Sequence, residues 1–283
     1  MVAEKSKGAV VVRVFYQSLG VEQQLAQAVS AGSVDIGMLS NGNSGRFTTA
    51  YYIYDLPFLF KSYENVLKSL ETPIGKQAIA QFEKDLGVKL LFPVSWGRGR
   101  DVQSRNKQLR TPADIKGLKI RVISSPVDLA TFKAWGANPT PVDWAQTFTA
   151  LQQGVVEGEN IPFHLLLPSK HYEVIKHSTQ LDYQAVFQQV YMNAKKFASL
   201  SPAQQSVLLD AARDTQPRQR RLELEKIERA AQDLQKLGVQ LYTPTPQEYA
   251  QWAAIREKVW QEVAEEQKGK IDLGVAKRLY ESQ

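Results

Sequence analysis

The feature that most constrains the fold is a regular alternation of strand-like and helix-like segments. Apolar residues with strand spacing recur along the first half of the chain, at residues 8–16, 33–40, 88–96 and 117–123. Helical patterns lie between and after them, at residues 20–32, 62–87, 111–117, 126–136 and 143–154. This alternation predicts an α/β fold with a mostly parallel sheet that is covered by helices on both faces.

Proline and capping residues set the expected limits of the helices. The helix over residues 62–87 is expected to break near Pro73, because proline has no backbone N–H to donate. Thr111 is a typical helix cap, with Pro112 in the first turn and Asp114 at the third position.

The C-terminal part of the chain is mostly helical. A strand-like run over residues 181–193 precedes it. Apolar residues then recur every three or four positions between Val207 and Leu237, which predicts long amphipathic helices with an interruption near Pro217. One further strand and two helices are expected after them, at residues 239–244, 245–267 and 271–282.

Composition excludes several classes of function. The 283 residues include no cysteine, which excludes disulfides, thiolate metal sites and cysteine nucleophiles. The net charge of +6 raises the alternative of nucleic-acid binding. The most basic stretch, residues 213–230, is interspersed with glutamates, as expected of a solvated helix face, so no nucleic-acid partner is expected. No run approaches the roughly 20 apolar residues of a membrane span, and residues 1–20 show no signal-peptide pattern.

Common catalytic motifs are absent from the sequence. The sequence has neither a G-x-S-x-G nor a phosphate-binding G-x-x-x-x-G-K-[ST] motif. Its three histidines, His164, His171 and His177, are loosely spaced and have no acidic residue at ligand spacing. Glu157 and Glu159 are the nearest candidate pair of carboxylates, and no acid/base dyad is expected of them. We therefore expect no enzyme, no metal and no cofactor.

Cations and polar groups instead gather where strands are expected to end. They are Arg98, Arg100, Arg121, Trp144 and Asn160. In open α/β sheets, ligands lie in the crevice outside the carboxyl ends of the strands, and a guanidinium there matches the shape of a carboxylate. For each arginine taken singly, an internal salt bridge is the alternative, and a core position is the alternative for the tryptophan.

Five separated motifs resemble one known family. They are "DLPFLF", "GRGR", "RTPADIKGLKIRV", "WGANPTPVDWAQTFTALQQGVVEGENIP" and "SLSPAQQSVLLDAA", in this order along nearly the whole chain. The chain is similar to the DctP-type solute-binding proteins of TRAP (tripartite ATP-independent periplasmic) transporters. The resemblance implies a class II-like periplasmic-binding-protein fold, in which two α/β domains are joined by crossing strands and a long helix, and close on a ligand between them.

The resemblance also implies site residues. Arg121 of "GLKIRV" is implied to form the main salt bridge to the carboxylate of an organic acid. A second arginine corresponds best to Arg100, with Arg98 as the competitor, while Trp144 and Asn160 correspond to an aromatic and an asparagine of the family site. Weaker correspondences are Asn41, Gln184 and Phe187.

The resemblance implies a domain plan and partners. We expect domain I over residues 1–122, domain II with crossover strands over 123–210, and C-terminal helices packing across both over 211–283. Family members carry a signal peptide, a strand and a helix ahead of the point where this sequence starts, so we expect these to be missing here. The implied protein is a periplasmic monomer that delivers an organic acid to membrane permease subunits. An extracytoplasmic ligand sensor that docks on a signalling receptor is the alternative.

Overall fold

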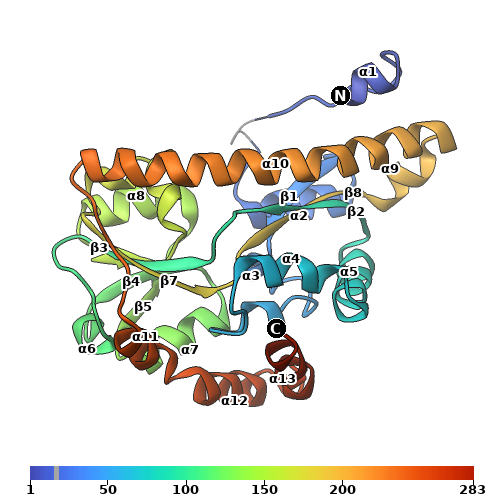
Figure 1. Cartoon of the computed structure of the whole chain (residues 1–283). Coiled ribbons are helices and arrows are strands. Elements are labelled where there is room, and N and C mark those ends of the chain that lie inside the picture. Colours follow the sequence, from blue (N-terminus) through green and yellow to red (C-terminus); the bar gives the residue numbers. More distant parts are fainter. Residues whose placement is uncertain (16–18) are drawn as a thin grey trace.

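Two β-sheets organise the chain. The computed structural model describes residues 1–15 and 19–283. In the described residues, the smaller sheet has the order β1-β8-β2, with β1 (Ile36–Ser40), β2 (Val88–Ser95) and β8 (Phe187–Asn193). The larger sheet has the order β5-β4-β6-β3-β7-β9, with β3 (Arg100–Ser104), β4 (Lys119–Val122), β5 (Asn138–Pro141), β6 (Gly158–Glu159), β7 (His177–Gln184) and β9 (Gln240–Tyr242). Each sheet and its helices form one lobe (Figure 1).

The smaller sheet is antiparallel and the larger one is mixed, so the expectation of a mostly parallel sheet is wrong. In the smaller sheet, β8 pairs antiparallel with both β1 and β2. In the larger sheet, β4 pairs parallel with β5 and β6, and β7 with β9, but β3 is antiparallel to β6 and β7. The reason is that β2 and β3 carry the chain from the smaller lobe to the larger one and β7 and β8 carry it back, so β2 pairs with β8, and β3 with β7, in opposite directions.

Sheet membership divides the chain differently from the expected ranges. Strands β3 and β4, which lie within the expected domain I, belong to the larger sheet, and β8, within the expected domain II, belongs to the smaller one. The chain crosses between the sheets near residues 96–99 and again near 185–186, so contiguous ranges cannot separate the lobes. Closure of the two lobes on a ligand stays a prediction.

Several helices of the smaller lobe begin at residues whose side chains cap them. The helices of this lobe are α2 (Glu22–Ala31), α3 (Asn41–Ser44), α4 (Tyr63–Glu71), α5 (Pro73–Leu86) and α9 (Ala194–Ser199). Ser62 caps α4, and the hydroxyl of Thr72 accepts from Gly75 to start α5, with Pro73 as its first residue. The expected break near Pro73 is therefore confirmed.

Helices also cover the larger sheet, and the strands β3 and β5 of that sheet were not predicted. The helices are α6 (Pro112–Ile115), α7 (Pro126–Ala134) and α8 (Trp144–Gln152). Thr111 and Asp114 form a reciprocal capping box at the start of α6, as the sequence predicts. Strand β3 was not expected, because "RDVQS" has a polar composition, and all five of its residues are buried by tertiary contacts.

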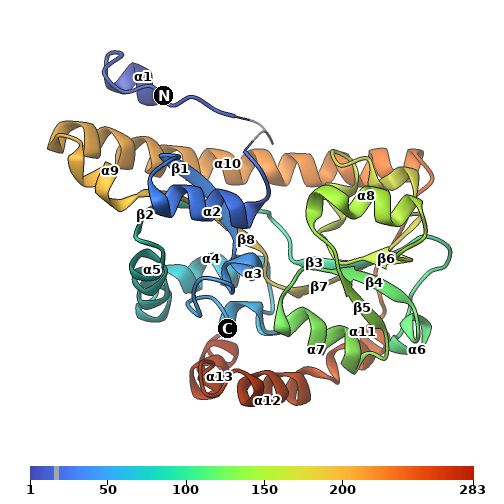
Figure 2. The ribbon, with the colours of Figure 1, turned by 180° about the vertical axis from the view of Figure 1, so that it is seen from behind.

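The long helix α10 (Pro202–Lys236) runs along both lobes (Figures 1 and 2). Its expected interruption near Pro217 is wrong, because the helix continues through that proline. Buried residues on either side anchor it, Leu208 and Ala211 before the proline and Ala230 and Leu234 after it. Tertiary packing of both halves outweighs the local cost of the proline.

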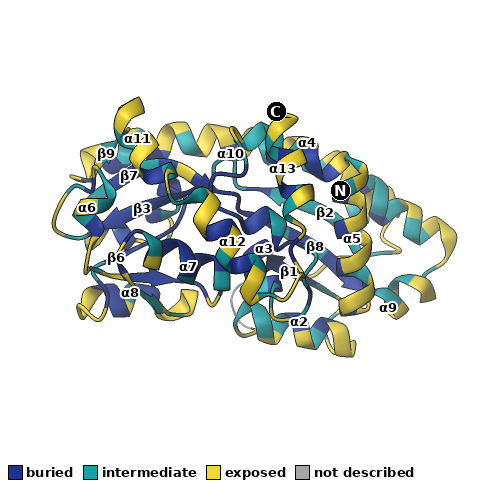
Figure 3. Ribbon diagram, turned by 90° about the horizontal axis from the view of Figure 1, so that it is seen from below, coloured by how far each residue is buried: buried dark blue, intermediate teal, exposed yellow. Residues whose placement is uncertain are grey.

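Three C-terminal helices cover the side of the molecule opposite α10 (Figure 1). They are α11 (Pro246–Ala253), α12 (Arg256–Glu266) and α13 (Leu273–Glu281). One core cluster joins Leu56 of the smaller lobe, Val127 of α7 and Trp260 of α12, so the apolar interior is continuous between the lobes. Burial concentrates in the strands and on the inner faces of the helices, with exposed residues outside (Figure 3).

The expected strand over residues 8–16 is absent from its described part. Residues 8–15 form no strand, and Val11 and Phe15 are 71% and 56% exposed. A strand needs a neighbour that accepts its hydrogen bonds, and no described strand pairs with this segment. Tyr16 lies outside the described residues.

The short helix α1 (Val2–Lys5), which precedes residues 8–15, contacts α10 through an ion pair between Lys5 and Asp214. No described helix is both long enough and apolar enough to cross a bilayer.

Candidate functional site

Arg121 lies on β4 in the middle of the larger sheet. Its neighbours in register are Thr140 on β5 and Glu159 on β6, and its side chain is 2% exposed. Its Nε donates a hydrogen bond to the carbonyl of Val142 at 2.9 Å, and its guanidinium lies 5.8 Å from the centre of the Trp144 ring. The strand therefore holds the guanidinium by one nitrogen and leaves the two terminal nitrogens for other partners.

The charge of Arg121 is buried without a direct counter-ion. Burial lowers its pKa to about 10, although nearby Glu159 opposes this. The charge of Arg100 lowers this pKa further, while the charge of Asp128 also opposes the fall. Among the described residues, no carboxylate forms an ion pair with Arg121. At neutral pH the guanidinium is still protonated, so it attracts an anion.

Arg100 provides the second cation of the site. It begins β3 opposite Gln184 on β7 and is 6% exposed. One of its terminal nitrogens, Nη1, donates to the backbone carbonyl of Asn160 at 2.8 Å. Arg121 and Arg100 thus lie on two strands that both flank β6, with Asn160 directly after that strand.

Asn160 joins Arg100 to two further buried groups. Its side-chain nitrogen donates to a carboxylate oxygen of Asp128 and to the hydroxyl of Tyr183, both at 2.9 Å. Asn160 and Asp128 are fully buried. Sequence reasoning found Asn160 but missed Asp128 and Tyr183. The only local signal for Asp128 is a carboxylate in the first turn of the helix after "SSP".

Asn41 and Gln184 connect the smaller lobe to the crossing strand. The side-chain nitrogen of Asn41 donates to Asp55 at 2.5 Å and to the Ala185 carbonyl at 3.0 Å, and its oxygen accepts from the backbone N–H of Phe187 at 2.9 Å. Gln184 donates to the Asp55 carbonyl at 2.9 Å. Burial and the charge of Asp128 raise the pKa of Asp55 well above its usual range.

Phe187 is placed differently from its expected position at the ligand. Its side chain is fully buried in the core of the smaller lobe, with its ring 5.4 Å from that of Tyr51 and 5.6 Å from that of Tyr54. Alternation along β8 turns this side chain toward the helices. Its contact with the site is through the backbone, to Asn41.

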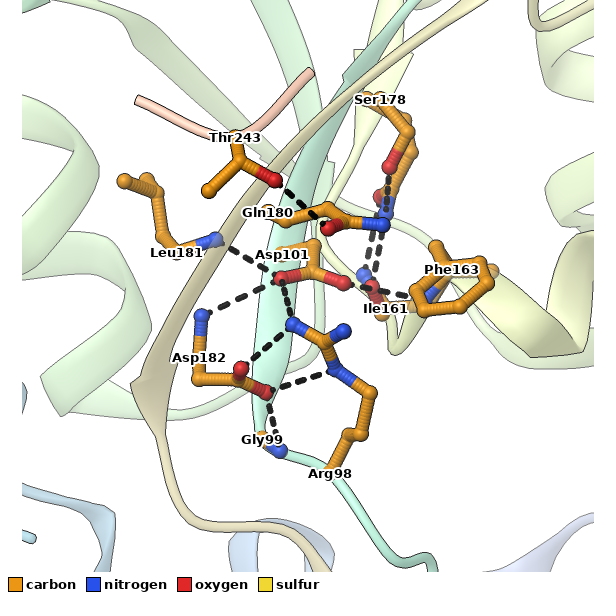
Figure 4. A network of polar contacts seen from close by, with 11 residues as sticks. Arg98, Gly99, Asp101, Ile161, Phe163, Ser178, Gln180, Leu181, Asp182 and Thr243 are labelled. Atoms are coloured by element: carbon orange, nitrogen blue, oxygen red, sulfur yellow. Dashed lines mark hydrogen bonds and ion pairs between the residues drawn. The ribbon is translucent and has the colours of Figure 1, made fainter. Parts of the chain in front are cut away.

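Arg98 does not join the other two arginines. Its guanidinium forms an ion pair with Asp182 and lies 3.9 Å from Asp101 (Figure 4). Asp101 also accepts hydrogen bonds from the backbone N–H groups of Leu181 and Phe163. For Arg98, the alternative of an internal salt bridge is therefore the one that the structure shows.

The Asp101 carboxyl lies within the network that joins the crossing strands. Burial and the charge of Asp182 raise its pKa to about 7, against the opposing charge of Arg98. A cavity of about 390 Å³ lies beside this network and is lined by Tyr63, Arg98, Tyr183 and Tyr249 among others. Neither Arg121 nor Arg100 lines this cavity.

A buried acid–histidine pair lies next to Arg121. Glu159, the neighbour of Arg121 in register, accepts from Nδ1 of His171 at 2.8 Å. The His171 ring is 5.0 Å from that of Trp144, which is 42% exposed at the start of α8. The sequence analysis did not pair His171 with Glu159, because a separation of twelve residues gives no local signal. In the described residues, no cluster of three potential metal ligands occurs.

The sequence matches the model of a known family and is similar to known relatives. The profile of the DctP family, described as bacterial extracellular solute-binding protein, family 7, matches residues 1–267. The chain is 31% identical over 245 residues to the 2,3-diketo-L-gulonate-binding periplasmic protein YiaO of Escherichia coli K12, across 86% of this chain and 74% of that protein. It is 29% identical over 262 residues to the C4-dicarboxylate-binding periplasmic protein DctP of Vibrio cholerae, across 92% of this chain and 78% of that protein.

A solved structure is similar over the full length. It is a TRAP periplasmic solute-binding protein from Roseobacter denitrificans with bound β-D-glucuronate. The two superpose with a TM-score of 0.91 at 25% identity, across 99% of this chain and 90% of that chain. This match confirms the expected two-domain periplasmic-binding-protein fold.

Proposed function

The chain belongs to the DctP family of bacterial extracellular solute-binding proteins, and from this premise we propose that it captures a small organic acid between its two lobes. The acid is then delivered to the membrane permease of a TRAP transporter. The proposed role is binding rather than catalysis, as in the relatives, whose names and titles describe solute-binding proteins.

The observation that carries the proposal is the buried charge of Arg121. A buried charge without a direct partner is costly, and a ligand carboxylate removes that cost. Nε is already occupied by Val142, so the two terminal nitrogens are the donors available for a two-bond contact with the acid. The same arrangement favours an anion over a neutral ligand.

The remaining residues have supporting roles in this proposal. Arg100 adds a second positive charge, and Asn160 positions Arg100 through its backbone carbonyl. Trp144 covers the face of the Arg121 guanidinium. Asn41 and Gln184 fix the smaller lobe to the crossing strand beside the site.

The cellular setting follows from the relatives. Those reported above are named or titled periplasmic, and we propose the same location for this chain. The proposed partners are the acid and the permease subunits, and the chain is proposed to act as a monomer.

Thermal denaturation in the presence of a broad set of carboxylates tests the proposal. A ligand that binds only the folded state raises the melting temperature, by an amount that grows with its concentration relative to Kd. We expect at least one acid to do so, and its neutral amide to have no effect. A set of acids without any such shift, or an equal shift by the amide, would contradict the proposal.

A further inference from the structure

Three buried oxygen atoms near the two arginines accept no hydrogen bond from the described residues. They are Oδ1 of Asp128, Oδ1 of Asn160 and Oε1 of Gln184. The exposed fractions of these residues are 0%, 0% and 2%. Buried polar atoms are normally paired, so three such acceptors in one place require an explanation.

The identity of these atoms as oxygens is fixed by their partners. The nitrogen of the Asn160 amide donates to the Asp128 carboxylate, which has no proton to offer in its ionised form. The nitrogen of the Gln184 amide donates to the Asp55 carbonyl, which can only accept. Each amide therefore presents its oxygen on the other side, and each of the three atoms needs a donor.

The three acceptors and the Arg100 guanidinium belong to one connected cluster, and the charges of Arg100 and Asp128 act on the Arg121 guanidinium. Gln184 is the register neighbour of Arg100, and Arg100 donates to the backbone of Asn160. Asn160 in turn holds Asp128 at 2.9 Å. The cluster thus combines donors that suit a carboxylate with acceptors that suit hydroxyl groups. Thr131, one turn after Asp128 on α7, adds a buried hydroxyl without a partner.

The charges of the cluster disfavour a ligand with two carboxylates. The positive charges of Arg121 and Arg100 already face the carboxylates of Asp55, Asp128 and Glu159. Burial first, and then the charge of Asp128, raise the pKa of Asp55 well above its usual range, so the charge of Asp128 already opposes ionisation of a second acidic group here. A second ligand carboxylate would meet this repulsion, whereas a hydroxyl would donate to the same oxygens.

We propose that the ligand is a sugar acid, with one carboxylate held by Arg121 and Arg100 and hydroxyl groups that donate to Asp128, Asn160 and Gln184. This inference rests on the proposed function, because it assumes that the acid binds at Arg121. It goes beyond that function by selecting polyhydroxy monocarboxylates over C4-dicarboxylates, a choice that the relatives leave open.

Isothermal titration calorimetry with four probes tests the inference. The probes are D-glucuronate and D-gluconate as sugar acids, succinate as a dicarboxylate, and D-glucose as a neutral sugar. We expect at least one sugar acid to bind roughly tenfold or more tightly than succinate, since one unpaired buried polar group alone changes affinity by about this factor. Glucose is expected not to bind.

The outcomes separate the inference from the proposed function. Binding of succinate as tight as or tighter than that of both sugar acids overturns the inference and leaves carboxylate capture in place. Binding of glucose as tight as that of glucuronate overturns both. Binding of no probe overturns the inference, and the broad set of carboxylates then decides the proposed function.

A variant without the Asp128 charge tests whether this charge selects sugar acids over dicarboxylates. Asp128→Asn keeps the shape and one acceptor oxygen but removes the negative charge. We expect it to narrow the affinity ratio of the preferred sugar acid to succinate by roughly tenfold. Asp233→Asn, on the exposed side of α10, serves as the matched control and is expected to leave the ratio unchanged. An unchanged ratio in a folded Asp128→Asn protein contradicts the inference, and if that variant does not fold, the wild-type ratio decides.

Discussion

Gly42 and Ile123 bring the two lobes into direct contact beside the two arginines. Gly42 lies on α3 of the smaller lobe, and Ile123 follows β4 of the larger lobe, two residues after Arg121. A Cβ atom at Gly42 would lie 2.4 Å from Cδ1 of Ile123. A side chain at residue 42 would require the Ile123 side chain to move, so the contact depends on both residues together.

The first prediction concerns this contact. We expect Gly42→Ala to weaken ligand binding roughly tenfold, because the added methyl group opposes closure of the lobes, while the unfolding temperature without ligand changes little. Ile123→Val removes Cδ1 and should restore affinity in the double variant, a coupling that a double-mutant cycle measures by calorimetry. Additive losses in the double variant would show that the two residues do not act through this contact.

The second prediction concerns the cation at the centre of the site. Arg121→Ala should reduce affinity for the bound acid by about 2–5 kcal/mol, the range for loss of one partner of a buried charge pair. Arg121→Lys should also bind weakly, since lysine retains the charge but loses the planar pair of donors. Calorimetry on folded protein provides the measurement. Affinity close to wild type in either variant is incompatible with the proposed salt bridge.

The third prediction distinguishes Arg100 from Arg98 as the second arginine of the ligand site. Arg100→Ala should weaken binding, because Arg100 lies in the cluster with Asn160. Arg98→Ala should instead lower the free energy of unfolding by about 1–3 kcal/mol, since it leaves the buried Asp101 without its nearby cation, and should keep ligand affinity within a few-fold. Calorimetry and urea denaturation on both variants give the comparison, and the reverse pattern would reassign the site to Arg98.

The fourth prediction concerns pH. The pKa of Asp101 is raised to about 7 by burial and by Asp182, so between about pH 4 and 7 the unfolded state loses this proton while the folded state keeps it. The contribution of Asp101 to stability is therefore greatest below pH 4, falls as the pH rises to 7, and is constant above that. Asp101→Asn should remove this slope in urea denaturation at a series of pH values. Parallel curves for the variant and the wild type would disprove it.

The fifth prediction concerns the proline within α10. Pro217→Ala should raise the free energy of unfolding by about 1–3 kcal/mol, because it restores a backbone donor and removes a clash in the helix interior, partly offset by a more flexible unfolded chain. Pro202→Ala is the matched control, since proline is well suited to the first helical position. A loss of stability in Pro217→Ala would indicate that the proline has a structural role in this helix.

Local chemistry in the sequence determined a large part of the fold. The caps at Ser62, Thr72 and Thr111 and the placement of Arg121 on a strand depend on neighbouring residues, and the structure shows each of them. A local signal also gave a wrong prediction at Pro217, where packing on both sides of the proline stabilises a continuous helix. The strand expected over residues 8–16 is the converse case, in which a strand-like pattern has no partner in its described part.

Only the tertiary structure decided which charged groups meet. Arg98 is paired with Asp182, which is 84 residues away, while Arg100, two positions further on, faces Asn160. Asp128 comes from α7, whereas Tyr183 and Gln184 come from β7, and the three join one cluster only when β3 and β7 pair and α7 packs against their sheet. Phe187 likewise enters the core because the register of β8 turns it there. Residue types and local spacing identify a cation on a strand, but the partner of that cation depends on chain crossings that bring distant residues within hydrogen-bonding distance.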